Sequence, residues 1–159
     1  MVFKDYTFFF YVFLATAVIL FTGHTHGAGL CDNSPNKQVC YSIVFDRTDP
    51  RDASVAAGHK LIYETKVARV VAQKLTKSLE IDMCIDDFNG AIGYVKNALY
   101  FLSTRDYITV KSYINETLSN YDHCDSLFEK YKNTNPLAKS TKHLEDIANV
   151  SLYLVTLLK

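Results

Sequence analysis

The sequence predicts an all-α fold: an up-down-up-down four-helix bundle, preceded by a helical hairpin that a disulfide closes. Four long segments carry apolar residues at alternating steps of three and four, and no segment sustains a period of two. The breaks between these segments are short, which makes neighbouring helices antiparallel. Four cysteines follow an apolar leader, a pattern typical of exported domains that disulfides brace.

The composition fits a single globular domain. The chain has 159 residues, of which 48% are hydrophobic, enough to build one core. Its formal net charge is zero, whereas a nucleic-acid partner usually requires a basic face. We therefore expect no nucleic-acid partner.

Residues 1–28 are expected to form a signal peptide, and residues 29–159 the mature domain. Lys4 precedes a nearly unbroken apolar run over residues 8–21, which is too short to span a membrane comfortably. Small residues follow, and cleavage is expected after Gly27 or Ala28. The mature chain would then have no membrane segment. An uncleaved N-terminal anchor is the alternative.

Two glycosylation sequons, beginning at Asn115 and Asn149, agree with export. Asn115 falls on a polar stripe of its predicted helix, together with Lys111 and Asp122. Asn149 adjoins Ala148, which belongs to an apolar seam. We expect Asn115 to carry the sugar more readily than Asn149.

The four cysteines, Cys31, Cys40, Cys84 and Cys124, allow three pairings. Cys31 and Cys40 lie close together, whereas Cys84 and Cys124 fall in two different helical segments. Proximity favours the pairs Cys31–Cys40 and Cys84–Cys124. The first bond would staple the N-terminal hairpin, and the second would tie two long helices together.

The first half of the chain predicts the hairpin and two long helices. Residues 31–47, interrupted by Pro35, are expected to form the hairpin, and Asp49 and Pro50 suit the cap and first position of a helix. The first long seam consists of Leu61, Thr65, Ala68, Ala72, Leu75 and Leu79. The second consists of Ile85, Phe88, Ile92, Val95, Leu99 and Leu102.

The second half predicts two more helices with the same periodicity. The third seam consists of Tyr107, Val110, Ile114, Thr117, Tyr121, Cys124 and Phe128. The fourth consists of Leu137, Thr141, Leu144, Ala148, Ser151, Val155 and Leu158, widened by Ile147 and Leu154. Short polar links at residues 103–106 and 133–136 separate these helices from their predecessors.

Candidate catalytic residues are few, and we expect no enzyme, no metal and no cofactor. The chain lacks the metalloprotease, serine-hydrolase and phosphate-loop motifs. His123, Cys124 and Asp125 could form a metal or nucleophile cluster, but an oxidised Cys124 and a surface His123 are favoured in an exported chain. Asp86 and Asp87 are interpreted as acids near a helix N-terminus, which carries partial positive charge.

Three aromatic residues are candidates for binding a protein partner. Tyr94, Tyr100 and Phe101 fall on the outer side of the second long helix, because its seam occupies the other face. Large aromatic side chains on a solvated face are typical of interface anchors. The alternative is that they pack under the hairpin or a neighbouring helix.

The cysteine framework and several local strings resemble those of a known family. The first cysteine pair encloses eight residues and the second encloses thirty-nine. The similar strings are Cys84-Ile-Asp-Asp-Phe88, Val95-Lys-Asn-Ala-Leu99, Asn115-Glu-Thr-Leu118, His123-Cys124-Asp-Ser-Leu-Phe128 and Ile147-Ala-Asn-Val-Ser-Leu152. Over residues 31–159 the chain is similar to the plant invertase and pectin methylesterase inhibitor family.

This resemblance implies a secreted four-helix bundle with an N-terminal hairpin that inhibits an enzyme and catalyses no reaction. Pectin methylesterase inhibitors of the family lay bundle helices over the cleft of the esterase. Invertase inhibitors of the family insert a Pro-Lys-Phe segment into the glycosidase active site. The equivalent string here, Asp106-Tyr107-Ile108-Thr109, lacks Pro-Lys-Phe.

Three further features depart from the family pattern. The stretch between Cys40 and Cys84 is shorter than usual, and the loss falls between Leu75 and Met83. Little remains before Cys31 after signal cleavage, so the first small helix is truncated. His123 stands where the family often has threonine.

Together these observations predict a secreted inhibitor in the apoplast or cell wall, monomeric before it binds its target. The expected protein partner is pectin methylesterase, which the bundle would block sterically. Inhibition of cell-wall or vacuolar invertase is the alternative. A second alternative, of another class, is a secreted helical carrier of a small apolar ligand.

Overall fold

The structure, a computed structural model, describes residues 28–159 and confirms the all-α fold. Its helices are α2 (Ala28–Cys31), α3 (Lys37–Val44), α4 (Pro50–Gln73), α5 (Leu79–Ser103), α6 (Tyr107–Lys130) and α7 (Ala138–Thr156). No strand occurs within this described range. The expected signal peptide occupies residues 1–28, which lie almost wholly outside it.

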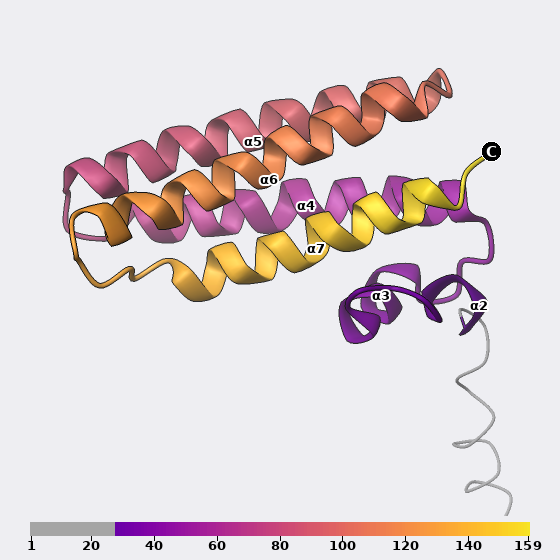
Figure 1. The fold of residues 1–159 in the computed structure, drawn as a ribbon, viewed down its shortest axis with the longest axis horizontal. Helices are drawn as coiled ribbons and strands as arrows, with labels where there is room; N and C mark the ends of the chain where they lie inside the picture. The colour runs from indigo at the N-terminus through magenta and orange to yellow at the C-terminus, as the bar shows by residue number, and fades with distance from the viewer. Residues whose placement is uncertain (1–27) are drawn as a thin grey trace, which may run out of the picture.

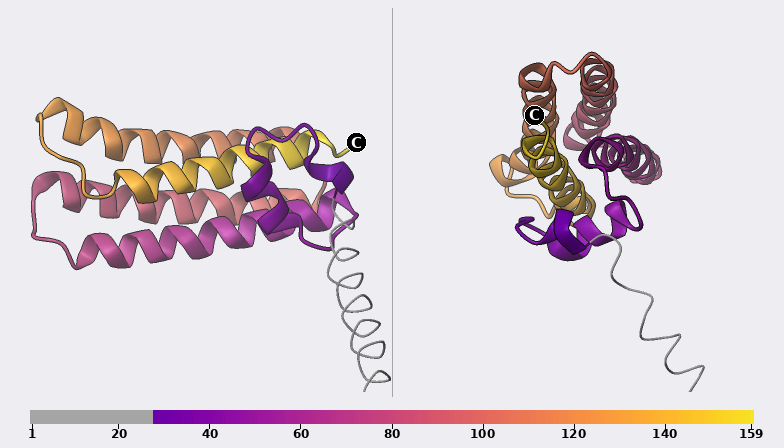
Figure 2. Two further views of the ribbon diagram at one scale, coloured as in Figure 1. Left: turned by 90° about the horizontal axis from the view of Figure 1, so that it is seen from below. Right: turned by 90° about the vertical axis from the view of Figure 1, so that its right-hand side faces the viewer.

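The four long helices form a square bundle in which sequential helices are neighbours. In Figure 1, α5 and α6 form one layer, and α4 and α7 form the other. The end-on view of Figure 2 places α4 and α6 at opposite corners. The hairpin α2–α3 lies against α4 and α7, at the end of the bundle where the C-terminus is found. The up-down-up-down topology follows from the short links.

Polar side chains fix where the helices begin. Asn36, Asp49, Ser78 and Asp106 each precede a helix and accept a hydrogen bond from a backbone N–H of its first turn. Pro50 stands at the first position of α4, where the missing N–H costs nothing. These caps satisfy amide groups that have no partner within the helix.

The buried seams agree with the sequence expectation in the middle of each helix and depart from it mainly in α5 and at the α4–α5 link. The first seam was expected to continue to Leu79, but α4 ends at Gln73, and Leu79 is the exposed first residue of α5. In α5 the fully buried stripe runs through Cys84, whereas Ile85 and Leu99 are only partly buried. The cause is a shift of about one position, because the disulfide brings Cys84 itself into the core.

Both disulfides join the cysteines that proximity favoured. Cys31 is bonded to Cys40 within the hairpin, and Cys84 of α5 is bonded to Cys124 of α6. All four cysteines are completely buried. The Cys124 sulfur, which the sequence predicted to be oxidised, is therefore part of the disulfide with Cys84.

The bundle interior is filled by side chains. Phe88 of α5 packs against Tyr121 of α6, with ring centroids 6.3 Å apart. The Tyr121 hydroxyl lies 2.6 Å from the Thr65 hydroxyl of α4, and burial raises the pKa of Tyr121 well above its usual range. One internal void near Gly58 and Leu99 has a volume of about 10 Å³, room for a single water molecule.

Candidate partner-binding surface

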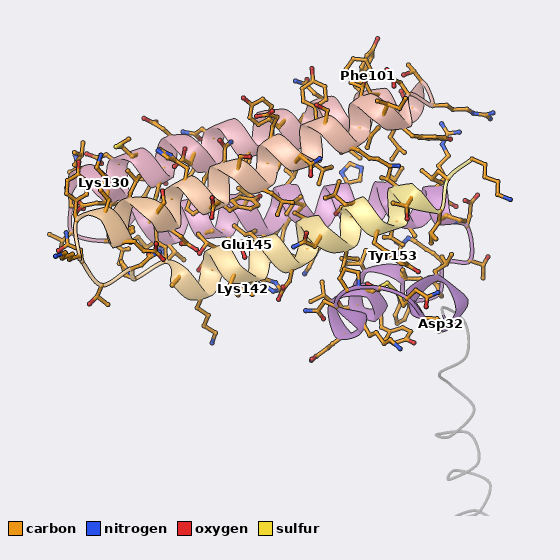
Figure 3. All side chains as sticks on the ribbon, in the orientation of Figure 1. Asp32, Phe101, Lys130, Lys142, Glu145 and Tyr153 are labelled. Atoms are coloured by element: carbon orange, nitrogen blue, oxygen red, sulfur yellow. A yellow bond between two sulfur atoms is a disulfide. The ribbon has the colours of Figure 1, made fainter. Side chains whose placement is uncertain are left out.

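An aromatic cluster covers the junction of α5 and α6. Phe101 of α5 stacks on Tyr113 of α6, with ring centroids 5.6 Å apart and ring planes at 22°. Tyr94 approaches the same Tyr113 ring at 6.1 Å, and Tyr100 meets Phe101 edge-on at 5.2 Å. We call these four residues the aromatic cluster. Figure 3 shows Phe101 at the C-terminal end of α5, on the edge of the molecule away from α4 and α7.

The structure divides the three predicted anchors into two kinds. Tyr100 is 64% exposed, as expected for a side chain on the outer face of α5. Tyr94 and Phe101 are only half-buried, because each leans on Tyr113 of the neighbouring helix. Packing on a neighbouring helix, the alternative, therefore holds for Tyr94 and Phe101. The role of the three rings as partner anchors stays a prediction.

Sequence reasoning missed two residues at this surface. Tyr113 stands one position before Ile114, a residue of the α6 seam, so the seam pattern alone assigned it no role. Ile108, in the first turn of α6, is 85% exposed and extends the apolar surface of this end of the bundle. The signal for both was a large apolar residue just outside a buried stripe.

Residues 106–109, the string that lacks Pro-Lys-Phe, form the start of α6. The Asp106 carboxylate accepts hydrogen bonds from the Thr109 hydroxyl at 2.7 Å and from the Thr109 N–H at 3.1 Å. These bonds hold the pKa of Asp106 below its usual value. The segment is thus a capped helical turn with an exposed isoleucine.

His123 links α6 to α5 on the surface. Its Nδ1 lies 2.9 Å from a carboxylate oxygen of Asp87, beside the Cys84–Cys124 bond. Partial burial raises the pKa of Asp87, and the hydrogen bond with His123 opposes that shift. The expectation that Asp86 and Asp87 lie near a helix N-terminus was wrong, because α5 begins at Leu79, seven positions before Asp86.

The two sequons both lie on helix surfaces. Asn115 is in α6 and Asn149 in α7, and both side chains are exposed. Asn149 is flanked by buried Ala148 and Val150, as its position beside the seam implied. The preference for glycosylation at Asn115 stays a prediction.

Residues 28–159 contain no group of three or more histidine, cysteine and acidic side chains that could hold a metal ion. Within the same part of the chain, no helix is long and apolar enough to cross a membrane.

Comparison with solved structures finds pectin methylesterase inhibitors. A mutant form of such an inhibitor from Arabidopsis superposes with a TM-score of 0.71, over 85% of this chain and 98% of that chain. A pectin methylesterase inhibitor from Arabidopsis thaliana gives a TM-score of 0.63, over 84% and 95%. Both are 14% identical to this chain, which thus shares their fold.

Sequence comparison adds nothing to this result. No family model matches the chain, and no curated protein matches it in sequence. The likeness therefore consists of the helical architecture.

Proposed function

We propose that this chain is a secreted inhibitor of pectin methylesterase that acts in the cell wall. The observation that supports the proposal most strongly is the fold, which matches two inhibitors of that enzyme over nearly their whole lengths. Two buried disulfides agree with an oxidising, extracellular location. The expected signal peptide would direct the chain there.

The inhibitory mechanism would be steric. A bundle braced by the Cys84–Cys124 bond offers a rigid surface that covers the substrate cleft without a covalent step. The aromatic cluster of Tyr94, Tyr100, Phe101 and Tyr113 would supply the anchor, because desolvated aromatic side chains contribute most at interface hot spots. The cluster is already packed in the free protein, so little side-chain entropy is lost on binding.

The two alternatives receive less support. The structural neighbours are pectin methylesterase inhibitors, and residues 106–109 lack the Pro-Lys-Phe string that invertase inhibition would use. A carrier of an apolar ligand needs an enclosed apolar cavity of several hundred Å³. The void inside this bundle measures about 10 Å³, and the hollow of about 410 Å³ at the helix links is open to solvent and lined partly by Ser78, Glu80 and Asn133.

The proposal is tested by titrating the mature protein against purified pectin methylesterase and purified invertase. Stoichiometric loss of esterase activity, with invertase unaffected, is the expected outcome. Loss of invertase activity alone would transfer the function to the alternative target. Full activity of both enzymes would reject the inhibitor proposal.

The aromatic anchor is tested by replacing Tyr94, Tyr100 and Phe101 together with serine. Inhibition should weaken about tenfold or more, since one decade corresponds to about 1.4 kcal/mol. The single variant Tyr100→Ser removes the most exposed ring and should weaken inhibition in the same direction without disturbing the packing on Tyr113. Inhibition constants measure the effect, and circular dichroism checks that the helices remain.

A matched control is Tyr63→Ser, because Tyr63 on α4 is 61% exposed, nearly as much as Tyr100. This control should leave inhibition unchanged. If Tyr100→Ser and Tyr63→Ser inhibit equally well, the aromatic cluster is not the anchor.

A further inference from the structure

The outer face of α4 carries an apolar row that no other element covers. Tyr63, Val67, Val70 and Val71 are between 41% and 61% exposed, and they account for four of the ten exposed large hydrophobic residues among those the structure describes. Their spacing of four, three and one places them on one side of the helix. This side is opposite to Leu61, Thr65, Ala68 and Ala72, which face the core.

Lysines flank this row. Between Ala53 and Leu79 the chain has five basic side chains, Lys60, Lys66, Arg69, Lys74 and Lys77, and one acidic side chain, Glu64, a net charge of +4. Because the whole of residues 28–159 is neutral, the rest of this range carries −4. The zero net charge of the protein therefore includes a positive stretch along α4 and its link to α5. We call the row together with Lys60, Lys66 and Lys74 the α4 stripe.

Most of this positive charge is uncompensated. Glu64 is paired with Lys60 at 2.7 Å, and Arg69 donates to the amide oxygen of Asn89 on α5. Within the described residues, no carboxylate lies at ion-pair distance from Lys66 or Lys74, and both lysines are exposed.

We propose that the α4 stripe binds a linear acidic polysaccharide, a polymer of uronic acids. From Lys60 to Lys74 the stripe extends about 21 Å along a regular helix, a long and narrow shape suited to an extended chain. Carboxylates repeated along such a polymer meet lysines on both sides of the row. The apolar C–H faces of its sugar rings pack on Tyr63 and the valines, which explains why these side chains stay exposed.

Other occupants fit the stripe less well. A protein partner favours tryptophan, tyrosine and arginine as anchors, and valine is under-represented among hot spots. Insertion into an anionic bilayer needs a face with larger apolar residues than three valines. Single-stranded nucleic acids are bound by several stacking aromatic side chains, whereas the stripe has one, Tyr63.

This surface is separate from the aromatic cluster. The cluster lies at the α5–α6 junction, and α4 occupies the corner of the bundle opposite α6 (Figure 2). An enzyme held at the cluster would leave the α4 stripe accessible. The inference does not rest on the proposed inhibition, although the two combine well, because hydrolysis of methyl esters in pectin generates carboxylates of this kind.

The experiment measures binding of the mature protein to immobilised polygalacturonate. The test variant is Lys66→Glu with Lys74→Glu. The control variant is Lys37→Glu with Lys139→Glu, which alters the net charge equally through two exposed lysines on α3 and α7. Fully methyl-esterified pectin, poly-L-glutamate and phosphatidylglycerol vesicles are the comparison ligands.

We expect the unmodified protein to bind polygalacturonate and to release it as the salt concentration rises. It should not bind fully methyl-esterified pectin detectably. The Lys66/Lys74 variant should bind about tenfold more weakly and the control variant no more than about twofold. Tyr63→Ser should weaken binding about threefold. Equal losses in both double variants, or no binding by the unmodified protein, would overturn the site.

Tighter binding to polyglutamate or to the vesicles would overturn the choice of a polysaccharide. Binding to immobilised pectin methylesterase, measured without polysaccharide, is followed in parallel. The Lys66/Lys74 variant should retain it, so that failure of the inhibitor proposal and failure of the polysaccharide site give different results.

Discussion

The N-terminal hairpin and the α5–α6 pair each contain one disulfide, but the two regions depend on that bond to different degrees. In the hairpin, helices of four and eight residues surround the bond, and Tyr41 and Phe45 remain exposed. In the α5–α6 pair, helices of 25 and 24 residues surround it, and Phe88 and Tyr121 are buried beside it. One region depends on its disulfide for structure, and the other has a core of its own.

The two regions differ because their helices differ in length. Helices shorter than about 12 residues are marginal in water, so the hairpin needs a covalent closure to order it. Helices of six to seven turns are stabilised by packing, and a bond between them acts mainly by restricting the unfolded chain. The following changes test whether the two regions differ in this way.

Removal of the Cys84–Cys124 bond should have the largest effect on global stability. The chain-entropy model gives about 4 kcal/mol for a loop of 40 residues. We expect Cys84→Ala with Cys124→Ala to lower the free energy of unfolding by about that amount while α5 and α6 remain helical. Urea denaturation followed by circular dichroism measures both. A loss of helix before any urea is added would contradict a self-supporting pair.

Removal of the Cys31–Cys40 bond should cost less, about 2.5 kcal/mol for its shorter loop, and should act locally. In the variant Cys31→Ala with Cys40→Ala, hydrogen exchange of the α3 amides should rise strongly, while amides of α5 and α6 stay protected. If protection falls equally in both regions, the hairpin is an integral part of the bundle core and the comparison fails.

Loss of the α6 cap should destabilise the bundle by less than removal of either disulfide. Asp106→Ala removes the acceptor of the Thr109 hydrogen bonds. Because these bonds lower the pKa of Asp106, their contribution is complete above the unfolded pKa and disappears as pH falls through the folded pKa. Thermal unfolding of both proteins should therefore differ at neutral pH and converge in acid.

The smallest effect concerns the end of α3. Phe45 has φ 51° and ψ −104°, a sparsely populated backbone conformation that costs about 1–3 kcal/mol for a residue with a side chain, and the ring is 76% exposed. Phe45→Gly should relieve that cost and raise stability by about 0.5 kcal/mol, after the entropy that glycine loses on folding. The gain should appear as slower exchange in α3; faster exchange there would mean that the Phe45 ring stabilises the hairpin.

The sequence predicted the fold well because the fold depends on periodicity and covalent geometry. The seams of α6 and α7 run as expected except at their ends, where Tyr107 is only partly buried and Leu158 lies beyond α7, and the cysteine pairs are those that proximity favoured. The α4–α5 link was misplaced because Leu75 and Leu79 continue the apolar spacing of α4, although α4 already ends at Gln73 and Ser78 caps the start of α5. The spacing of apolar residues alone does not reveal where one helix ends and the next begins.

The surface was less predictable, since contacts between helices determine it. Tyr100 was expected to be exposed and is, but the packing of Tyr94 and Phe101 depends on Tyr113, more than ten positions away. The pairing of His123 with Asp87 likewise joins residues of different helices. These contacts depend on the rotation of each helix about its axis, which a list of apolar positions gives only approximately.

The hydroxyl contact between Thr65 and Tyr121 sets the alignment of the bundle along its length. It joins α4 to α6, the helices at opposite corners, at 2.6 Å in a fully buried position. If α4 moved along α6 by one turn, about 5.4 Å, the Tyr121 hydroxyl would lose this partner, at a cost of about 1–3 kcal/mol. Sliding of the helices is thus penalised, and the surface that the bundle presents to any partner is rigid along the helix axes.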